Sequence, residues 1–146
     1  MSTPKIQLFN HQRGHRVAKR WLEKIAIAAL PSCLAAAKSD HPPLLSLEEI
    51  EVSIVSDSKI SKVHADFLGD DSPTDVITFH HGEILISADT ALRQGLDHHQ
   101  SMDQELALYL VHGLLHLAGW EDEDPEEQAA MHRLQEKILA SAIASL

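Results

Sequence analysis

Two histidines one helical turn apart are the residues of this chain best placed to do chemistry. His112 and His116 lie in the apolar run Leu110–Trp120. Side chains at positions i and i+4 of a helix project from the same face, so both imidazoles can bind one metal ion. The pair alone is a weak signal, because either ring could be a core imidazole hydrogen-bonded to a backbone carbonyl.

A glycine and a carboxylate follow the pair at spacings that favour a three-ligand site. Gly119 comes three residues after His116, where a left-handed turn can end a helix and fold the chain back. Asp122 could then be the third ligand, with Glu121 and Glu123 as alternatives on the same loop. Two neutral imidazoles and a carboxylate suit Zn²⁺ and also other divalent ions. Three protein ligands leave a coordination position open for water, as catalytic zinc sites do.

The residue after the first histidine distinguishes this pattern from a common protease motif. In His-Glu-x-x-His proteases the glutamate is the general base. This chain has Gly113 at that position, which counts against peptide hydrolysis by that route. A zinc ion on three ligands would still lower the pKa of its water from about 15.7 to around 7 and supply hydroxide at neutral pH.

The bulk composition is that of an ordinary globular protein. The chain has 146 residues, 44% of them hydrophobic and 23% charged, and this length predicts one domain over residues 1–146. Its single cysteine, Cys33, excludes an intramolecular disulfide and indicates a reducing compartment. The apolar stretch Ile25–Leu30 is far too short to span a membrane. We therefore predict a cytoplasmic protein without a membrane partner, and the pattern leaves its oligomeric state open.

The net charge of −10 is unevenly distributed along the chain. Residues 1–38 have a balance of +6, whereas residues 39–146 have a balance of −16, much of it in the acidic segment 121–127. Four basic residues of the first part follow one another at helical spacing: Arg13, Arg16, Arg20 and Lys24. Such a basic segment is compatible with a phosphate-rich partner, although charge alone favours a solvated helix face.

The order of the predicted elements indicates an α+β domain with a small mixed sheet of about four strands and helices packed on it. Strands are predicted at 5–9, 49–55, 75–79 and 83–87, and helices at 11–30, 57–68, 88–95, 101–117 and 125–144. The connection His80–Gly82 is short enough for a hairpin, so the last two strands should be antiparallel. Ser101 and Gln104 have the spacing of a capping box.

Three ordered blocks within residues 63–122 resemble the YbeY family, bacterial metal-dependent endoribonucleases of ribosomal RNA maturation. The run His112-Gly-Leu-Leu-His-Leu-Ala-Gly-Trp-Glu-Asp122 is similar to the family's His-Gly-x-Leu-His-Leu-x-Gly-Tyr-Asp-His, whose three histidines bind zinc. The run Pro73-Thr-Asp-Val-Ile-Thr-Phe79 resembles Pro-Thr-Asp-Val-Leu-Ser-Phe. The run Gly82-Glu-Ile-Leu-Ile-Ser87 resembles Gly-Asp-Ile-x-Ile-Ser.

The resemblance implies a zincin-like metal helix and hydrolysis of single-stranded RNA. One zinc ion would be held by His112, His116 and Asp122, the last at the place of the family's third histidine, and both histidines would act through the metal-bound water. Leu68 stands where the family usually has an arginine, thought to hold the scissile phosphate through its planar fork. A leucine cannot do this, so the charge developing on the phosphoryl oxygens would be met by the metal alone or by another cation.

Two functions are compatible with these residues. The first is a metal-dependent endoribonuclease acting in ribosomal RNA maturation and ribosome quality control, with the basic residues of 13–24 as candidate RNA contacts. The second is a catalytically weakened homologue that binds ribosomal RNA or a ribosome-associated protein. The His112/His116 pair favours the first, and Leu68 favours the second.

Overall fold

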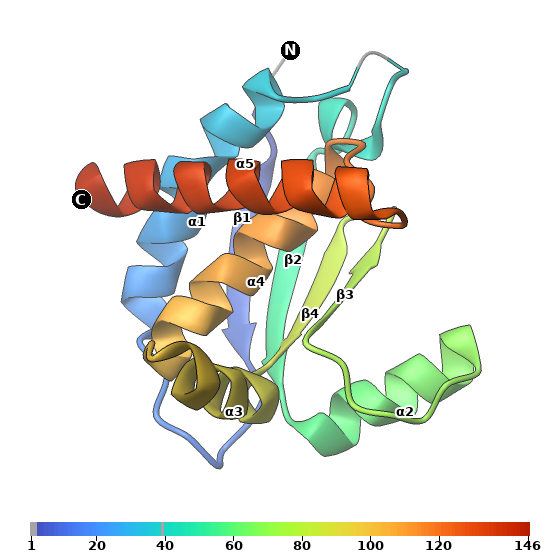
Figure 1. Ribbon diagram of the computed structural model, residues 1–146, viewed down its shortest axis with the longest axis vertical. Coiled ribbons are helices and arrows are strands. Elements are labelled where there is room, and N and C mark those ends of the chain that lie inside the picture. Colours follow the sequence, from blue (N-terminus) through green and yellow to red (C-terminus); the bar gives the residue numbers. More distant parts are fainter. Residues whose placement is uncertain (1–2, 39) are drawn as a thin grey trace.

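The computed structural model describes residues 3–38 and 40–146, which form a four-stranded mixed sheet and five α helices (Figure 1). The elements are β1 (Lys5–Asn10), α1 (Lys19–Ala35), a 3-10 turn (Pro43–Leu45), β2 (Glu49–Val55), α2 (Asp57–Leu68), β3 (Val76–Phe79), β4 (Glu83–Ser87), α3 (Ala88–His98), α4 (Met102–Leu117) and α5 (Pro125–Ala144). The strand order is β1-β2-β4-β3, and β3 with β4 is the antiparallel pair. The predicted α+β class and the predicted hairpin are confirmed. None of the described helices is long and apolar enough to cross a membrane.

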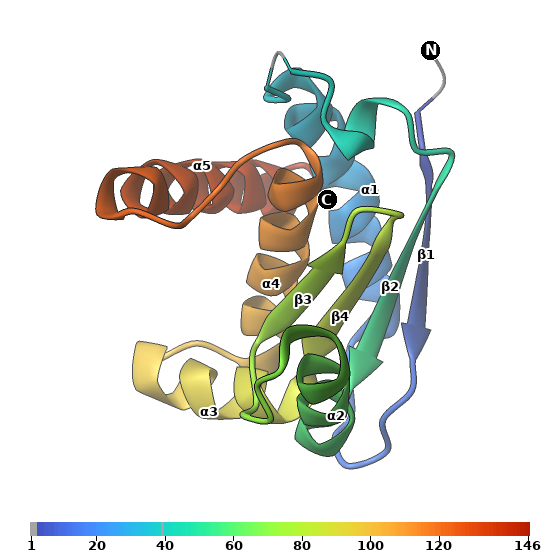
Figure 2. The same cartoon turned by 90° about the vertical axis from the view of Figure 1, so that its right-hand side faces the viewer.

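The two faces of the sheet are covered unequally. Helices α1 and α4 pack on one face with α5 lying across them, and α2 packs on the other face (Figures 1 and 2). Successive residues of β4 point to opposite faces, so Ile84 and Ile86 join the main core while Leu85 joins a small cluster under α2. Strand β3 ends the strand order, so one of its backbone edges has no neighbouring strand among the described residues.

Helix α4 has well-defined ends, which fix where its two histidines lie along the helix axis. At its start Ser101 Oγ accepts from the Gln104 backbone N–H at 3.1 Å, and Gln104 Oε1 accepts from the Ser101 N–H at 2.9 Å, which confirms the predicted capping box. After its last turn Gly119 has φ +96°, and a Cβ there would lie 3.0 Å from Lys38 Cβ. Only glycine fits this turn, which sends the chain back toward the histidines.

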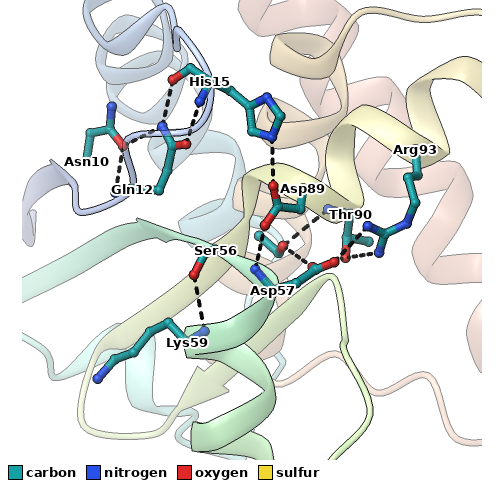
Figure 3. Close-up of polar contacts among 10 residues, drawn as sticks. Asn10, Gln12, His15, Ser56, Asp57, Lys59, Asp89, Thr90 and Arg93 are labelled. Atoms are coloured by element: carbon teal, nitrogen blue, oxygen red, sulfur yellow. Dashed lines mark hydrogen bonds and ion pairs between the residues drawn. The ribbon is translucent and has the colours of Figure 1, made fainter.

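The predicted helix 11–30 begins eight residues too early, because the residues after β1 form a turn of their own. The Gln12 side chain donates to Asn10 Oδ1 at 3.0 Å and to the His15 carbonyl at 2.8 Å, and it accepts from the His15 N–H at 2.9 Å (Figure 3). His15 Nε2 in turn lies 2.7 Å from Asp89 Oδ1 at the start of α3. These contacts hold the segment in a non-helical path until Lys19.

The late start of α1 separates the four predicted RNA-binding residues. Arg13 and Arg16 lie in the loop before the helix, whereas Arg20 and Lys24 lie on its exposed side. The predicted stripe of four cations on one helix is therefore wrong.

Two helices run further than predicted. Helix α1 continues past Pro31, whose missing N–H leaves the carbonyl of Ile27 without its helical donor. Ile27 is 66% exposed, so this side of the helix faces solvent and water can replace the missing hydrogen bond. Helix α3, predicted to end at 95, runs to His98 and ends with His99 in the left-handed conformation.

A polar network at the carboxyl ends of β2 and β4 ties α2 to α3 (Figure 3). Asp57 Oδ1 accepts from the hydroxyls of Ser87 and Thr90, both at 2.7 Å, and its Oδ2 lies 2.7 Å from Arg93 Nη1. Burial alone would raise the pKa of Asp57, but these hydrogen bonds and the Arg93 charge hold that pKa below its usual range. The network fixes the first turn of α2, and the other end of α2 carries Leu68.

Gly113 sets how closely α4 approaches the sheet. A Cβ at this position would lie 2.8 Å from Ile84 Cγ2 and 3.2 Å from Thr78 Oγ1. The two strands β3 and β4 therefore touch the backbone of the helix that carries the histidines.

Gly113→Ala is expected to lower the free energy of unfolding by about 1–3 kcal/mol, because the added methyl overpacks the contact with Ile84. Urea unfolding followed by circular dichroism measures the change. Gly14→Ala is the matched control, since the nearest atom to a Cβ there is Gln12 Oε1 at 3.9 Å. Equal stability of the Gly113→Ala variant and the wild type would contradict the close approach.

Candidate metal centre

Three possible metal ligands converge beside the end of α4. The Nε2 atoms of His112 and His116 lie 2.9 Å apart, and their rings are nearly perpendicular at 86°. Asp122 Oδ2 lies 3.4 Å from His112 Nε2 and 3.7 Å from His116 Nε2. Among the described residues, this is the one group of three or more His, Cys, Asp or Glu side chains whose ligand atoms all lie within 4.8 Å of one another. The structure thus brings together the three residues that the spacing predicted.

The other nitrogen of each ring is held by an oxygen. His112 Nδ1 donates to Gln135 Oε1 of α5 at 2.8 Å, and His116 Nδ1 donates to the Trp120 carbonyl at 2.9 Å. Because these oxygens accept, the hydrogen of each neutral imidazole sits on Nδ1. Both Nε2 atoms are then lone-pair donors to a metal, and the ring orientation is fixed as in natural metal sites.

The donor set fits a divalent cation. Two Nε2 lone pairs and a carboxylate oxygen face one another with no hydrogen between them, which is unfavourable unless a positive charge lies among them. Burial lowers the pKa of His112 below its ordinary value of 6.5, so the neutral ring that binds a metal is favoured over the protonated one. That these residues hold an ion stays a proposal.

The ligands lie in a cleft of about 370 Å³ along the open edge of β3. Its lining comes from α2, β3, the hairpin, α4 and the following loop: His64, Leu68, Thr74, Asp75, Val76, Ile77, Thr78, His80, His112, His116, Glu121 and Asp122. Four of these are histidines and three are carboxylates, and none is lysine or arginine. A phosphate entering the cleft would therefore meet no permanent cationic side chain.

The other predicted site residues lie partly inside the cleft and partly outside it. Glu121 lines the cleft but does not belong to the converging group, and Glu123 is exposed outside the cleft. Leu68 is 63% exposed and lines the cleft, so the position at which the sequence resemblance implies an arginine does face the site. None of the basic residues in 13–24 lines it.

Sequence reasoning missed Gln135 and the role of two further histidines. Gln135 lies on α5, 23 residues after His112, and no local pattern links the two. His64 lies one turn before Leu68 on α2 and lines the same cleft, and its Nδ1 lies 3.0 Å from the Ser72 carbonyl. His80, at the hairpin, also lines the cleft.

A larger hollow of about 550 Å³ lies on the other side of the turn after α4. Lys38, Trp120 and Glu126 contribute to its lining, and Lys38 Nζ lies 3.9 Å from the centre of the Trp120 ring. It contains none of the three converging ligands, so the smaller cleft is the candidate site.

Comparison with known proteins decides the family. The family model described as Endoribonuclease YbeY matches residues 7–142. The chain belongs to the YbeY family. The Endoribonuclease YbeY of Heliobacterium modesticaldum is 35% identical over 116 residues, which cover 64% of this chain and 70% of that protein. The Endoribonuclease YbeY of Synechococcus sp. (strain CC9902) is 30% identical over 149 residues, covering 92% of this chain and 80% of that protein.

A solved structure supports the YbeY assignment at the level of the fold. The solution structure of TM1509 from Thermotoga maritima matches with a TM-score of 0.65, over 96% of this chain and 90% of that one. At 23% identity the likeness shows the fold alone. The resemblance predicted from the three sequence blocks is confirmed by the family match.

His112→Ala, His116→Ala and Asp122→Ala should each reduce bound zinc, because each removes one of three ligands. Metal analysis of the purified variants measures this, with Glu121→Ala as the control that lies in the same cleft. Retention of zinc by the His112→Ala/His116→Ala double variant would exclude the site. Loss in Glu121→Ala but not in Asp122→Ala would move the third ligand by one residue.

Gln135→Leu should weaken zinc affinity by about 10–100-fold, because the partner that orients His112 is lost while all three ligands remain. Competition with a chromogenic chelator measures the affinity. Gln128→Leu, on the exposed side of α5, is the control. Unchanged affinity in Gln135→Leu would show that the His112 ring needs no such support.

Proposed function

We propose that this chain is a zinc-dependent endoribonuclease that cleaves single-stranded RNA during ribosomal RNA maturation and ribosome quality control in the cytoplasm. The observation that carries the proposal is the convergence of His112, His116 and Asp122 in an open cleft. The names of the family model and of the curated relatives supply the reaction class. Ribosomal RNA is the proposed substrate, and ribosome-associated proteins are the proposed partners.

Each side chain of the site has a defined task. A divalent ion held by the three ligands would polarise a phosphoryl oxygen and lower the pKa of a water molecule. Gln135 and the Trp120 carbonyl keep the two imidazoles turned so that both Nε2 atoms face the same point. Burial lowers the pKa of His112, which favours its neutral ring. The open edge of β3 leaves the metal ligands accessible from solvent to an extended RNA strand.

Among the described residues, the cleft lacks a lysine or arginine side chain that could stabilise the negative charge of the transition state. Negative charge that develops on a phosphoryl oxygen is best stabilised by cationic or hydrogen-bond donors set in place beforehand. Besides the metal ligands, the cleft offers the imidazoles of His64 and His80 for this purpose. Arg13, Arg16, Arg20 and Lys24 stay candidates for contacts with parts of the RNA outside the cleft.

The proposed activity is tested with a labelled single-stranded RNA and a duplex of the same sequence. Zinc-loaded protein should cleave the single strand internally, and both a chelator and His116→Ala should abolish cleavage. His132→Ala, an exposed histidine of α5, is the matched control. Cleavage that survives in His116→Ala, or no cleavage by protein shown to hold zinc, would overturn the proposal.

Leu68→Arg should accelerate cleavage by roughly thirty- to a thousand-fold, since one placed cation can stabilise the transition state by ~2–4 kcal/mol. The position lines the cleft, so an arginine there can reach a bound phosphate. Single-turnover cleavage measures the rate. Leu96→Arg, at an exposed position of α3, is the control for added charge. Brisk wild-type cleavage without gain from Leu68→Arg would show that another group already fills the role.

A further inference from the structure

Three aromatic rings from α2 and the β3–β4 hairpin form a row. The rings of Phe67 and Phe79 meet edge to face, with centroids 5.5 Å apart and an interplanar angle of 73°. The rings of Phe79 and His81 are stacked, with centroids 5.4 Å apart and an interplanar angle of 15°. Phe67 comes from the last turn of α2, and the other two come from the β3–β4 hairpin. We call these three residues the aromatic ledge.

The ledge is more exposed than packing of the fold requires. Phe67 is 69% exposed, and the side chain of His81 is 70% exposed. Phe79 packs against the small core under α2, but Phe67 is not part of that core. A large aromatic side chain left in solvent contributes little to folding, so its exposed face is available for a partner.

None of the three ledge residues lines the cleft, but chain neighbours of all three do. Leu68, the neighbour of Phe67, lines the cleft and is itself 63% exposed. His80, which lies between Phe79 and His81 in the chain, also lines the cleft. Phe79 packs under α2, whereas Thr78 beside it contacts Gly113 of α4. The ledge therefore lies on the α2 side of β3, and an RNA strand would reach it by continuing beyond the cleft over Leu68 or around the hairpin.

We propose that the aromatic ledge is a subsite for an unpaired nucleobase of the RNA strand whose phosphate lies in the cleft; this rests on the proposed function. Aromatic side chains bind single-stranded nucleic acid by stacking on base faces, whatever the base. Apart from the proposed metal ion, the described residues of the cleft offer a phosphate no lysine or arginine side chain, so stacking can supply further affinity. Bases within a duplex have no free faces, so the ledge would also select single strands.

Binding and cleavage are measured separately, so that the subsite and the proposed function can fail independently. A labelled RNA decamer without self-complementarity is titrated with zinc-loaded protein, and fluorescence anisotropy gives the dissociation constant. The same decamer is then prepared in ten versions, each with one abasic nucleotide. The variants are Phe67→Ala, Phe67→Trp and the control Leu96→Ala, whose side chain is 71% exposed on α3.

Phe67→Ala should bind the intact decamer roughly five- to a hundred-fold more weakly, whereas Phe67→Trp and Leu96→Ala should bind like the wild type. One abasic position should weaken binding by the wild type but not by Phe67→Ala, which identifies the base on the ledge. Zinc content should be equal in all variants.

Unchanged affinity of Phe67→Ala, or equal loss at every abasic position in both proteins, would overturn the subsite. A change of oligomeric state in Phe67→Ala without loss of RNA affinity would assign the ledge to a second copy of the chain instead. If the base-specific loss occurs but the RNA is never cleaved, the proposed endoribonuclease fails and the subsite stands. If Phe67→Ala cleaves the RNA and binds it with full affinity, the subsite fails and the proposed endoribonuclease stands.

Discussion

Three electron-pair donors held within 3.7 Å of one another are the constraint on which this structure depends. Two imidazole lone pairs and a carboxylate oxygen repel each other, and a positive charge among them, whether a proton or a metal ion, relieves this repulsion. The protein holds them together from three directions. The turn of α4 sets the two rings, Gln135 on α5 and the Trp120 carbonyl fix their tautomers, and the loop after Gly119 returns Asp122 to the same point.

The same packing decides which hydrolysis the helix can support. In a protease of the His-Glu-x-x-His type, the second residue of the motif needs a long side chain beside the metal. Here that position is Gly113, and even a methyl group would lie 2.8 Å from Ile84 Cγ2. The sheet therefore occupies the space in which a general base would lie. The open edge of β3 lies beside the ligands, and it is accessible to an extended RNA strand.

The parts of the site that the sequence could predict are those set by local spacing. His112, His116, Gly119 and Asp122 lie within eleven residues, so helical periodicity and one glycine turn suffice to bring them together. The start of α1 depends instead on His15 and Asp89, which are 74 residues apart. The basic stripe was predicted from a helix over 11–30, so it was wrong for the same reason. Gln135 was missed for the same reason, because its role exists only once α5 lies across α4. The blocks around 73–87 predicted the hairpin correctly but gave no sign that its rings would meet Phe67.

Leu68 bears on affinity as well as on the rate of cleavage, because it lies next to Phe67 of the ledge in the chain and lines the cleft. A cation that clamps a phosphate contributes affinity that weakens as salt rises, because counterions compete for the same charge. Stacking of a base on Phe67 and its neighbours does not depend on counterion release. The acidic segment 121–127 repels a polyanion at long range, so affinity based on phosphate contacts would be reduced further near this loop. With Leu68 at the cleft and the proposed base subsite on the ledge, affinity would come from the bases rather than from the backbone phosphates. The exposed cations at 13–24 lie outside the cleft, where they can attract RNA without choosing which phosphate reaches the metal ligands.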